Sequence, residues 1–152
     1  MPEHGHLKRL DRIWIPNAVY FITVCTKDRK PILAVPDIAD LLRHEWQAAS
    51  KRHGWLIGRY VIMPDHVHFF CAEQSAGSKR SLAGFMNKWK EWTSKEICAA
   101  SGAAAPVWQP EFFDHALRND ESYAEKWLYV RENPVRAGLA ATWDQWPHQG
   151  VV

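Results

Sequence analysis

Cysteine is scarce in this sequence, and its spacing excludes two classes of protein. Only three cysteines occur among the 152 residues, at Cys25, Cys71 and Cys98, and no two of them form a C-x-x-C pair. An odd number of widely separated cysteines argues against a disulfide framework and against a cysteine-ligated zinc site. We therefore expect reduced thiols, as in the cytoplasm.

Long apolar runs are also lacking. No stretch of the sequence approaches the roughly 18 consecutive apolar residues that span a bilayer. The first ten residues are polar and basic and contain no apolar core of the kind that a secretory signal requires. These absences predict a cytoplasmic protein with no membrane partner.

The remaining composition is typical of one globular domain. Hydrophobic residues make up 47% and charged residues 24% of the chain, and its length favours a single core. We interpret residues 1–152 as one domain in which residues 1–17 form an irregular basic arm. The nine tryptophans are unusually many, and most are expected to fill the core because indole is a large apolar group.

The net charge is only +2, but basic residues gather in two stretches. Residues 1–30 and 79–96 each contain more lysine and arginine than acidic residues, so both can follow a phosphate backbone. Solvated surface is the alternative interpretation. Trp14 adds a ring that can stack on an unpaired base. The candidate DNA-binding residues are Arg9, Arg12, Trp14, Lys79, Arg80 and Lys88.

Apolar periodicity and turn residues divide the chain into strands and helices. The first helix is expected to begin at a cap on Asp37. The first six elements follow the order strand, helix, strand, strand, helix, strand, which predicts an α+β fold of the ferredoxin-like class, an antiparallel sheet with helices on one face. An additional helix follows towards the C-terminus. Strands are expected over 18–26, 55–63, 66–72 and within 107–118, and helices over 37–52, 81–100 and 119–132.

His66 and His68 are separated by one residue in an expected strand. Side chains at positions i and i+2 of a strand point to the same face, about 7 Å apart along the chain. Two such imidazoles can converge on one metal ion. Paired strand histidines without any role are the alternative. The flanking Val67 and Phe69 are expected to face the opposite side.

Tyr129 lies on the polar side of the last expected helix. A helical wheel places Tyr123, Trp127 and Val130, with Ala124 and Leu128, on one apolar arc, and Tyr129 almost opposite its centre. A tyrosine used for packing would lie on the apolar arc. Tyr129 is therefore predicted to face solvent or a site, where its hydroxyl can act as a nucleophile.

Asn133 follows Tyr129 by four residues and is expected on the same side of that helix. Its amide oxygen is a hard, neutral ligand that suits Mg²⁺ or Mn²⁺. A helix C-terminal residue before Pro134 is the alternative interpretation. Together, the two histidines and Asn133 can hold a divalent metal that polarises a phosphodiester, while Tyr129 attacks the phosphorus.

Several ordered motifs resemble one known family. The segment MPDHVHF (63–69) resembles the HUH motif of the single-tyrosine transposases. Four further segments resemble those of the REP-associated branch of that family: AVYFITVCT (18–26), VWQPEFFDHALR (107–118), YVRENPVRAGL (129–139) and DQWP (144–147). The resemblance extends over residues 10–147.

This resemblance implies an enzyme that cuts and rejoins hairpin-forming single-stranded DNA through a 5′-phosphotyrosine, with Mg²⁺ or Mn²⁺, as a monomer or homodimer. His66 and His68 match the metal-binding pair, and Tyr129 matches the nucleophile. Asn133 stands where relatives place a polar ligand, often glutamine. His115 lies in the FFDH segment as an active-site neighbour or a structural histidine. Where the branch commonly reads like WPWSS, this chain reads WPHQG, so we expect the N-terminal arm to help bind hairpins.

Two other functions fit parts of the pattern. A domesticated single-stranded DNA-binding or nicking protein would no longer mobilise DNA, and cleavage without strand joining would support this alternative. A metal hydrolase of small substrates would use the paired histidines and would keep its activity after loss of Tyr129.

Overall fold

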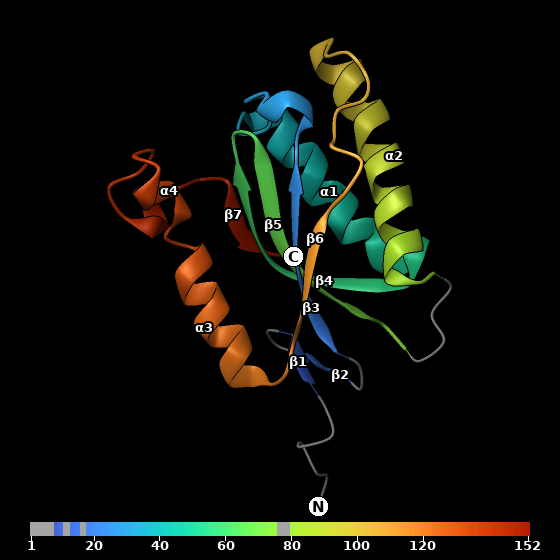
Figure 1. Cartoon of the computed structure of the whole chain (residues 1–152), viewed down its shortest axis with the longest axis vertical. Helices are drawn as coiled ribbons and strands as arrows, with labels where there is room; N and C mark the ends of the chain where they lie inside the picture. The colour runs from blue at the N-terminus through green and yellow to red at the C-terminus, as the bar shows by residue number, and fades with distance from the viewer. Residues whose placement is uncertain (1–7, 11–12, 16–17, 76–79) are drawn as a thin grey trace, which may run out of the picture.

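The computed structural model describes residues 8–10, 13–15, 18–75 and 80–152. An antiparallel five-stranded sheet with the order β6-β3-β5-β4-β7 forms its centre (Figure 1). The first four of these strands in chain order have the arrangement of the ferredoxin-like class, so the predicted fold class is confirmed. The strands are β3 (Val19–Cys25), β4 (Trp55–Met63), β5 (His66–Glu73), β6 (Phe113–Leu117) and β7 (Gln149–Val151).

Helices α1 (Pro36–His53) and α2 (Leu82–Ser101) cover one face of the sheet. Trp46 of α1 and Trp89 of α2 stack with ring centroids 5.9 Å apart, and both pack on Phe69 of β5. Both tryptophans are almost fully buried, as is Trp55. The prediction that indole rings fill the core is thus confirmed for these three.

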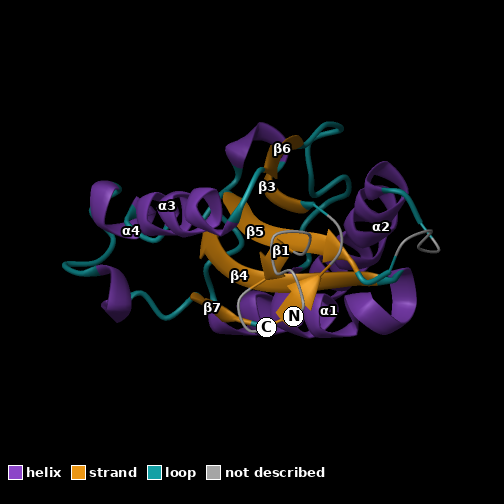
Figure 2. Cartoon of the chain, turned by 90° about the horizontal axis from the view of Figure 1, so that it is seen from below, coloured by secondary structure: helices purple, strands orange, loops and turns teal. Residues whose placement is uncertain are grey.

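Helix α3 (Asp120–Val130) packs on the opposite face, and Figure 2 shows α1 and α3 on the two sides of the sheet. Its buried side chains are Tyr123, Trp127 and Val130, which join Phe70 of β5 in a second, smaller cluster. The Tyr123 and Phe70 rings stack 4.4 Å apart. Leu10, from the N-terminal segment, joins the same cluster, so α3 and this segment both pack on this face of the sheet.

Local signals set most helix ends. Asn119 caps α3 by accepting a hydrogen bond from the Ser122 amide, and Gly54 ends α1 in the left-handed conformation with φ 74°. The expected cap on Asp37 is wrong. Helix α1 begins at Pro36 after an extended Val35, because proline suits the first helical position, where no amide hydrogen bond is needed.

Both ends of the chain contain structure that the sequence patterns did not predict. The arm is not irregular throughout, since β1 (Lys8–Leu10) pairs with β2 (Ile13–Ile15). Near the C-terminus, α4 (Asn133–Arg136) and the short 3-10 helix η3 (Trp143–Gln145) precede β7, which pairs with β4. Elements of three or four residues are too short to show periodicity, so the sequence patterns do not reveal them.

No helix in the described part of the chain is long and apolar enough to cross a membrane.

Candidate active site

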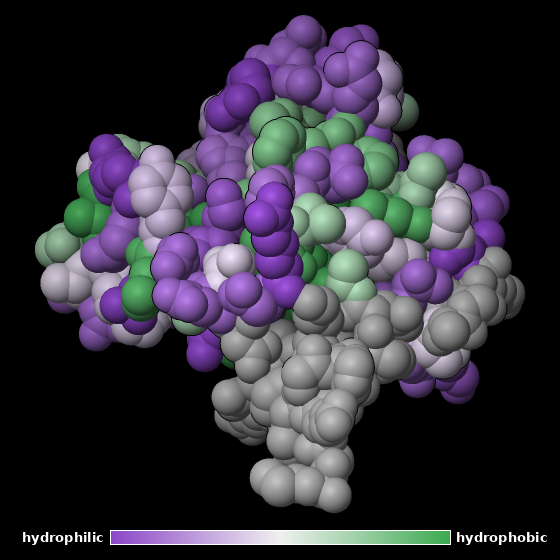
Figure 3. Space-filling view, turned by 60° about the horizontal axis from the view of Figure 1, so that its bottom comes forward, coloured by the Kyte–Doolittle hydropathy of each residue, from purple (hydrophilic) through white to green (hydrophobic). Residues whose placement is uncertain are grey.

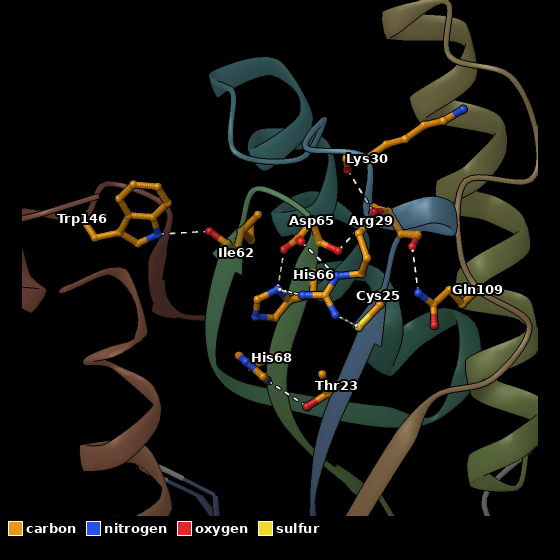
Figure 4. A network of polar contacts seen from close by, with 11 residues as sticks. Thr23, Cys25, Arg29, Lys30, Ile62, Asp65, His66, His68, Gln109 and Trp146 are labelled. Carbon is orange, nitrogen blue, oxygen red and sulfur yellow. Dashed lines mark hydrogen bonds and ion pairs between the residues drawn. The ribbon is translucent and has the colours of Figure 1, made fainter. Parts of the chain in front are cut away.

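His66 and His68 lie side by side on β5, on the face of the sheet that also carries α3. Their ring centroids are 4.8 Å apart, and the rings are nearly perpendicular. Both imidazoles project from the strand towards the α3–α4 side of the sheet (Figure 4). Val67 and Phe69 belong to the core on the α1–α2 side. The alternation expected of a strand is therefore confirmed.

His68 is held by two residues of the neighbouring strand β3. The Thr23 hydroxyl is 2.8 Å from His68 Nδ1, and the Phe21 ring stacks on the imidazole with centroids 5.3 Å apart. Burial lowers the pKa of His68 to about 3, and the positive charges of Lys126, Arg136 and Arg29 contribute, as does His66. A neutral imidazole retains a lone pair at neutral pH, which metal binding requires.

His66 is held by Asp65 and Arg29. Asp65 Oδ1 accepts a hydrogen bond from His66 Nδ1 over 2.7 Å, and Asp65 Oδ2 accepts one from Arg29 Nε over 2.9 Å. Although burial acts to raise the pKa of Asp65, the hydrogen bonds from Arg29 and His66 lower it. The carboxylate is thus ionised at neutral pH and fixes the orientation of the His66 ring.

Tyr129 projects from the exposed side of α3. Its side chain is 64% exposed, whereas Tyr123 on the same helix is buried, so the predicted orientation of both is confirmed. Leu128 was expected on the apolar arc but is 51% exposed, because α3 contacts the sheet through a narrower stripe of residues. In Figure 3 the surface at the left, over α3 and α4, accordingly mixes hydrophobic and hydrophilic side chains.

Arg136 of α4 turns back onto α3 and contacts Tyr129. Its guanidinium carbon lies 4.1 Å from the centre of the tyrosine ring, and Nη2 donates to the Tyr129 carbonyl oxygen over 2.7 Å. Arg136 also contributes to the lowered pKa of His68. This arginine therefore contacts the expected nucleophile directly and acts on His68 through its charge.

Asn133 does not continue the helix of Tyr129, as the sequence suggested. Helix α3 ends at Val130, and Asn133 is the first residue of α4. Its side-chain oxygen accepts a hydrogen bond from Arg136 Nη2. The turn between α3 and α4 thus places Asn133 near Tyr129. In this arrangement the side-chain oxygen of Asn133 is hydrogen-bonded to Arg136.

Of the expected DNA-binding residues, only Arg80 and Lys88 have described side chains, and both lie on the opposite side of the sheet from the histidine pair. Arg12 and Lys79 lie outside the described residues, and the side chains of Arg9 and Trp14 are likewise not described. Lys88 and Arg80 belong to α2 and the segment before it, on the layer that covers the other face of the sheet. There Lys88 pairs with Glu91, and Arg80 Nε donates to His53 Nδ1.

Lys126 and His115 lie on the face that carries the histidines. Lys126 Nζ is 5.1 Å from the centre of the Phe21 ring, which itself stacks on His68. His115 is exposed on β6 opposite Phe21 in the strand register, so Phe21 separates it from His68. Tyr129 follows Lys126 by one helical turn, which places the hydroxyl-bearing ring along the same side of α3.

Four neighbours of the site were missed by sequence reasoning: Thr23, Arg29, Asp65 and Arg136. Thr23 and Arg29 approach from β3 and the short 3-10 helix η2 (Lys27–Arg29), which the strand pairing brings next to β5. Only Asp65, which directly precedes His66, had a local signal. Its position in a tight turn gave it a structural explanation that concealed its contact with His66.

The histidine pair fits a divalent metal in part. When each Nδ1 donates, to Asp65 from His66 and to Thr23 from His68, each Nε2 carries the lone pair that a metal needs. Among the described residues, no group of three or more histidine, cysteine, aspartate or glutamate side chains is placed to hold a metal. Further ligands would have to be amide, water or phosphate oxygens, which suits Mn²⁺ or Mg²⁺.

An antiparallel α+β sheet with paired histidines on a central strand and an exposed tyrosine on an adjacent helix defines the class of single-tyrosine DNA transposases. A family model described as "Transposase IS200 like" matches residues 15–127, which is most of the chain. The chain therefore belongs to the IS200-like transposase family, and the resemblance inferred from its motifs is confirmed.

Individual relatives agree with this assignment. The REP-associated tyrosine transposase of Escherichia coli K12 is 27% identical over 136 residues, covering 90% of this chain and 78% of that protein. The solved structure of a REP-associated tyrosine transposase bound to a REP hairpin matches with a TM-score of 0.71 at 24% identity, covering 93% of this chain and 81% of that one. A second solved structure, from Deinococcus radiodurans, matches with a TM-score of 0.57 at 18% identity, covering 82% and 96%.

Proposed function

We propose that this transposase-family chain cleaves and rejoins hairpin-forming single-stranded DNA through a covalent 5′-phosphotyrosine on Tyr129. Mg²⁺ or Mn²⁺ would be held by His66 and His68, with the Asn133 oxygen as a further ligand once Arg136 releases it. The observation that carries the proposal is that the histidine pair and helix α3, which carries Tyr129, lie on the same face of the sheet. On that face Lys126 of α3 lies over the Phe21 ring that stacks on His68, and Arg136 contacts Tyr129.

The proposed reaction transfers a DNA phosphate to Tyr129 and is reversible. Tyr129 Oη attacks the phosphorus, the bond from phosphorus to the 3′ oxygen breaks, and the phenol proton passes to that departing oxygen. A free 3′-OH then attacks the phosphotyrosine, which restores a phosphodiester and returns the proton to Tyr129. A bound divalent metal would supply Lewis-acid stabilisation of the phosphate.

The chain's own residues assist by position and charge. Lys126, on the helix turn before Tyr129, is the candidate to ease loss of the phenol proton. Lys88 is not a candidate for this role, because it lies on α2, across the sheet from Tyr129. Lys126, Arg136 and Arg29 can bind the phosphates on either side of the cleaved bond. His115 is a further candidate contact at the β6 edge of this face.

Hairpin DNA is proposed as the substrate because a matched relative is described as bound to a REP hairpin. Strand exchange also requires unpaired bases, so plain duplex should be a poor substrate.

The test is incubation of the protein with end-labelled hairpin DNA and Mn²⁺, followed by denaturing electrophoresis and mapping of the labelled peptide. We expect a covalent adduct on the peptide that contains Tyr129. The variant His66→Ala/His68→Ala should fold, as judged by circular dichroism, but should form no adduct. Undiminished cleavage by this variant, or metal-independent cleavage by the wild type, would contradict the proposed metal site. Cleavage without any joined product would favour a nicking protein instead.

A further inference from the structure

Arg29 and His66 share one carboxylate. Arg29 Nε donates to Asp65 Oδ2, and His66 Nδ1 donates to Asp65 Oδ1, so both oxygens of Asp65 are used (Figure 4). The remaining guanidinium nitrogens lie 3.4 Å from Cys25 Sγ and 3.5 Å from His66 Nδ1. Rotation of the Asp65 side chain would break its hydrogen bond with Arg29 or the one with His66. Arg29 therefore limits how Asp65 and His66 can move.

The backbone at Arg29 has a conformation that a residue with a long side chain rarely adopts. Asp28 and Arg29 have φ angles of 57° and 52°, in the left-handed region where Cβ crowds the backbone. Glycine would fit either position without this strain. Strain of this kind persists where the surrounding structure requires the side chain, and it is concentrated at functional sites.

We propose that Arg29 is a positioning residue for metal binding, which acts through Asp65 to hold the His66 ring with Nε2 directed into the site. This inference rests on the proposed function, because it assumes that His66 binds the metal. A carboxylate that accepts a hydrogen bond from Nδ1–H fixes the tautomer and orientation of a ligating histidine and makes Nε2 more basic. Arg29 in turn fixes that carboxylate.

The charge of Arg29 taken alone predicts the opposite effect. A positive charge beside a cation site repels the cation, so neutralising Arg29 would strengthen metal binding if charge were its only contribution. A positioning role predicts weaker binding despite the removal of that charge. The sign of the change therefore separates the two explanations.

The experiment is calorimetric titration of Mn²⁺ into the full chain without DNA. Arg29→Gln should weaken Mn²⁺ binding by about tenfold or more, as loss of an outer partner of a ligating histidine does. Lys27→Gln is the matched control, because it removes a positive charge from the same turn, and it should bind Mn²⁺ at least as tightly as the wild type. Asp65→Asn should weaken binding like Arg29→Gln, and the double variant should be no weaker than Asp65→Asn alone.

Arg29→Gly separates positioning from a merely structural role. It relieves the left-handed strain, so its Tm should not fall below that of the wild type, yet its Mn²⁺ binding should be as weak as that of Arg29→Gln. A Tm that falls while the affinity for Mn²⁺ is unchanged would overturn the proposal. So would unchanged or tighter Mn²⁺ binding by Arg29→Gln, including the case in which only its affinity for hairpin DNA falls. If the wild type and His66→Ala/His68→Ala bind Mn²⁺ equally, the proposed metal site itself fails.

Discussion

The central guanidinium carbon of Arg136 lies 4.1 Å from the centre of the Tyr129 ring, while Nη2 of the same side chain donates to the Tyr129 carbonyl oxygen. The expected nucleophile is thus held from outside its own helix. Because Tyr129 is otherwise exposed, this contact is the main restraint on its ring among the described interactions.

Arg136→Lys should slow adduct formation on the order of tenfold, since lysine keeps the charge but not the planar group that orients the ring. Affinity for hairpin DNA should change little. Single-turnover kinetics with labelled DNA would measure the rate. Arg131→Lys is the matched control, because Arg131 stacks on Trp143 rather than on Tyr129. An equal loss of rate in both variants would contradict the role of Arg136.

Tyr129→Phe should remove the adduct while leaving the fold intact. The side chain is 64% exposed, so the free energy of unfolding should change by no more than about 0.5 kcal/mol. Tyr60→Phe should behave in the opposite way, because Tyr60 is buried and its hydroxyl accepts a hydrogen bond from Arg43. It should lose about 1 kcal/mol of stability and still form the adduct. A phosphotyrosine mapped to Tyr20, Tyr60 or Tyr123 would identify a different nucleophile.

Lys126→Gln should weaken DNA binding and reduce the slope of log affinity against log salt by about 1, because one phosphate contact is lost. Lys88→Gln should leave the slope unchanged, since Lys88 lies on α2, across the sheet, and pairs with Glu91. Fluorescence anisotropy with labelled hairpin DNA at several salt concentrations measures both. A larger effect of Lys88→Gln would place the DNA on the α2 side instead.

The stability of the α1–α2 layer should depend on pH through Glu96. Burial and its contact with Glu45 raise the pKa of Glu96 to about 7, while the pKa of Glu45, which pairs with Arg52, is lowered. The folded state therefore binds the Glu96 proton more tightly than the unfolded state does. The resulting stabilisation is complete below the ordinary pKa of 4.5 and is lost as the pH rises through about 7.

Melting curves between about pH 5 and 8 should show this loss in the wild type and a flatter profile in Glu96→Gln. Glu91→Gln provides the control on the same helix, because the pKa of Glu91 is lowered by Lys88 and Lys95 and titrates below this window. A profile that stays unchanged in Glu96→Gln would assign the pH dependence to other groups.

Local sequence patterns predicted much of the fold and the histidine and tyrosine side chains at the centre of the proposed site. Two-residue alternation predicted that His66 and His68 share a face, and helical periodicity predicted that Tyr129 faces away from the packed side of its helix. The order of strands and helices predicted the sheet with two helices on one face. Each of these properties depends on residues close together in the chain, so the sequence contains them directly.

The contacts that complete the site were decided by tertiary structure. Arg29 reaches Asp65 only because β3 pairs with β5, and Arg136 reaches Tyr129 only because α3 ends at Val130 and α4 turns back. The same holds for β7, whose three residues gain hydrogen bonds from β4 rather than from their neighbours. The sequence alone determined which chemical groups this protein has, that His66 and His68 share a face, and that Tyr129 faces away from the packed side of α3. The pairing of distant segments decided which groups meet, because such contacts depend on the closure of long loops and leave no periodic signal in the chain.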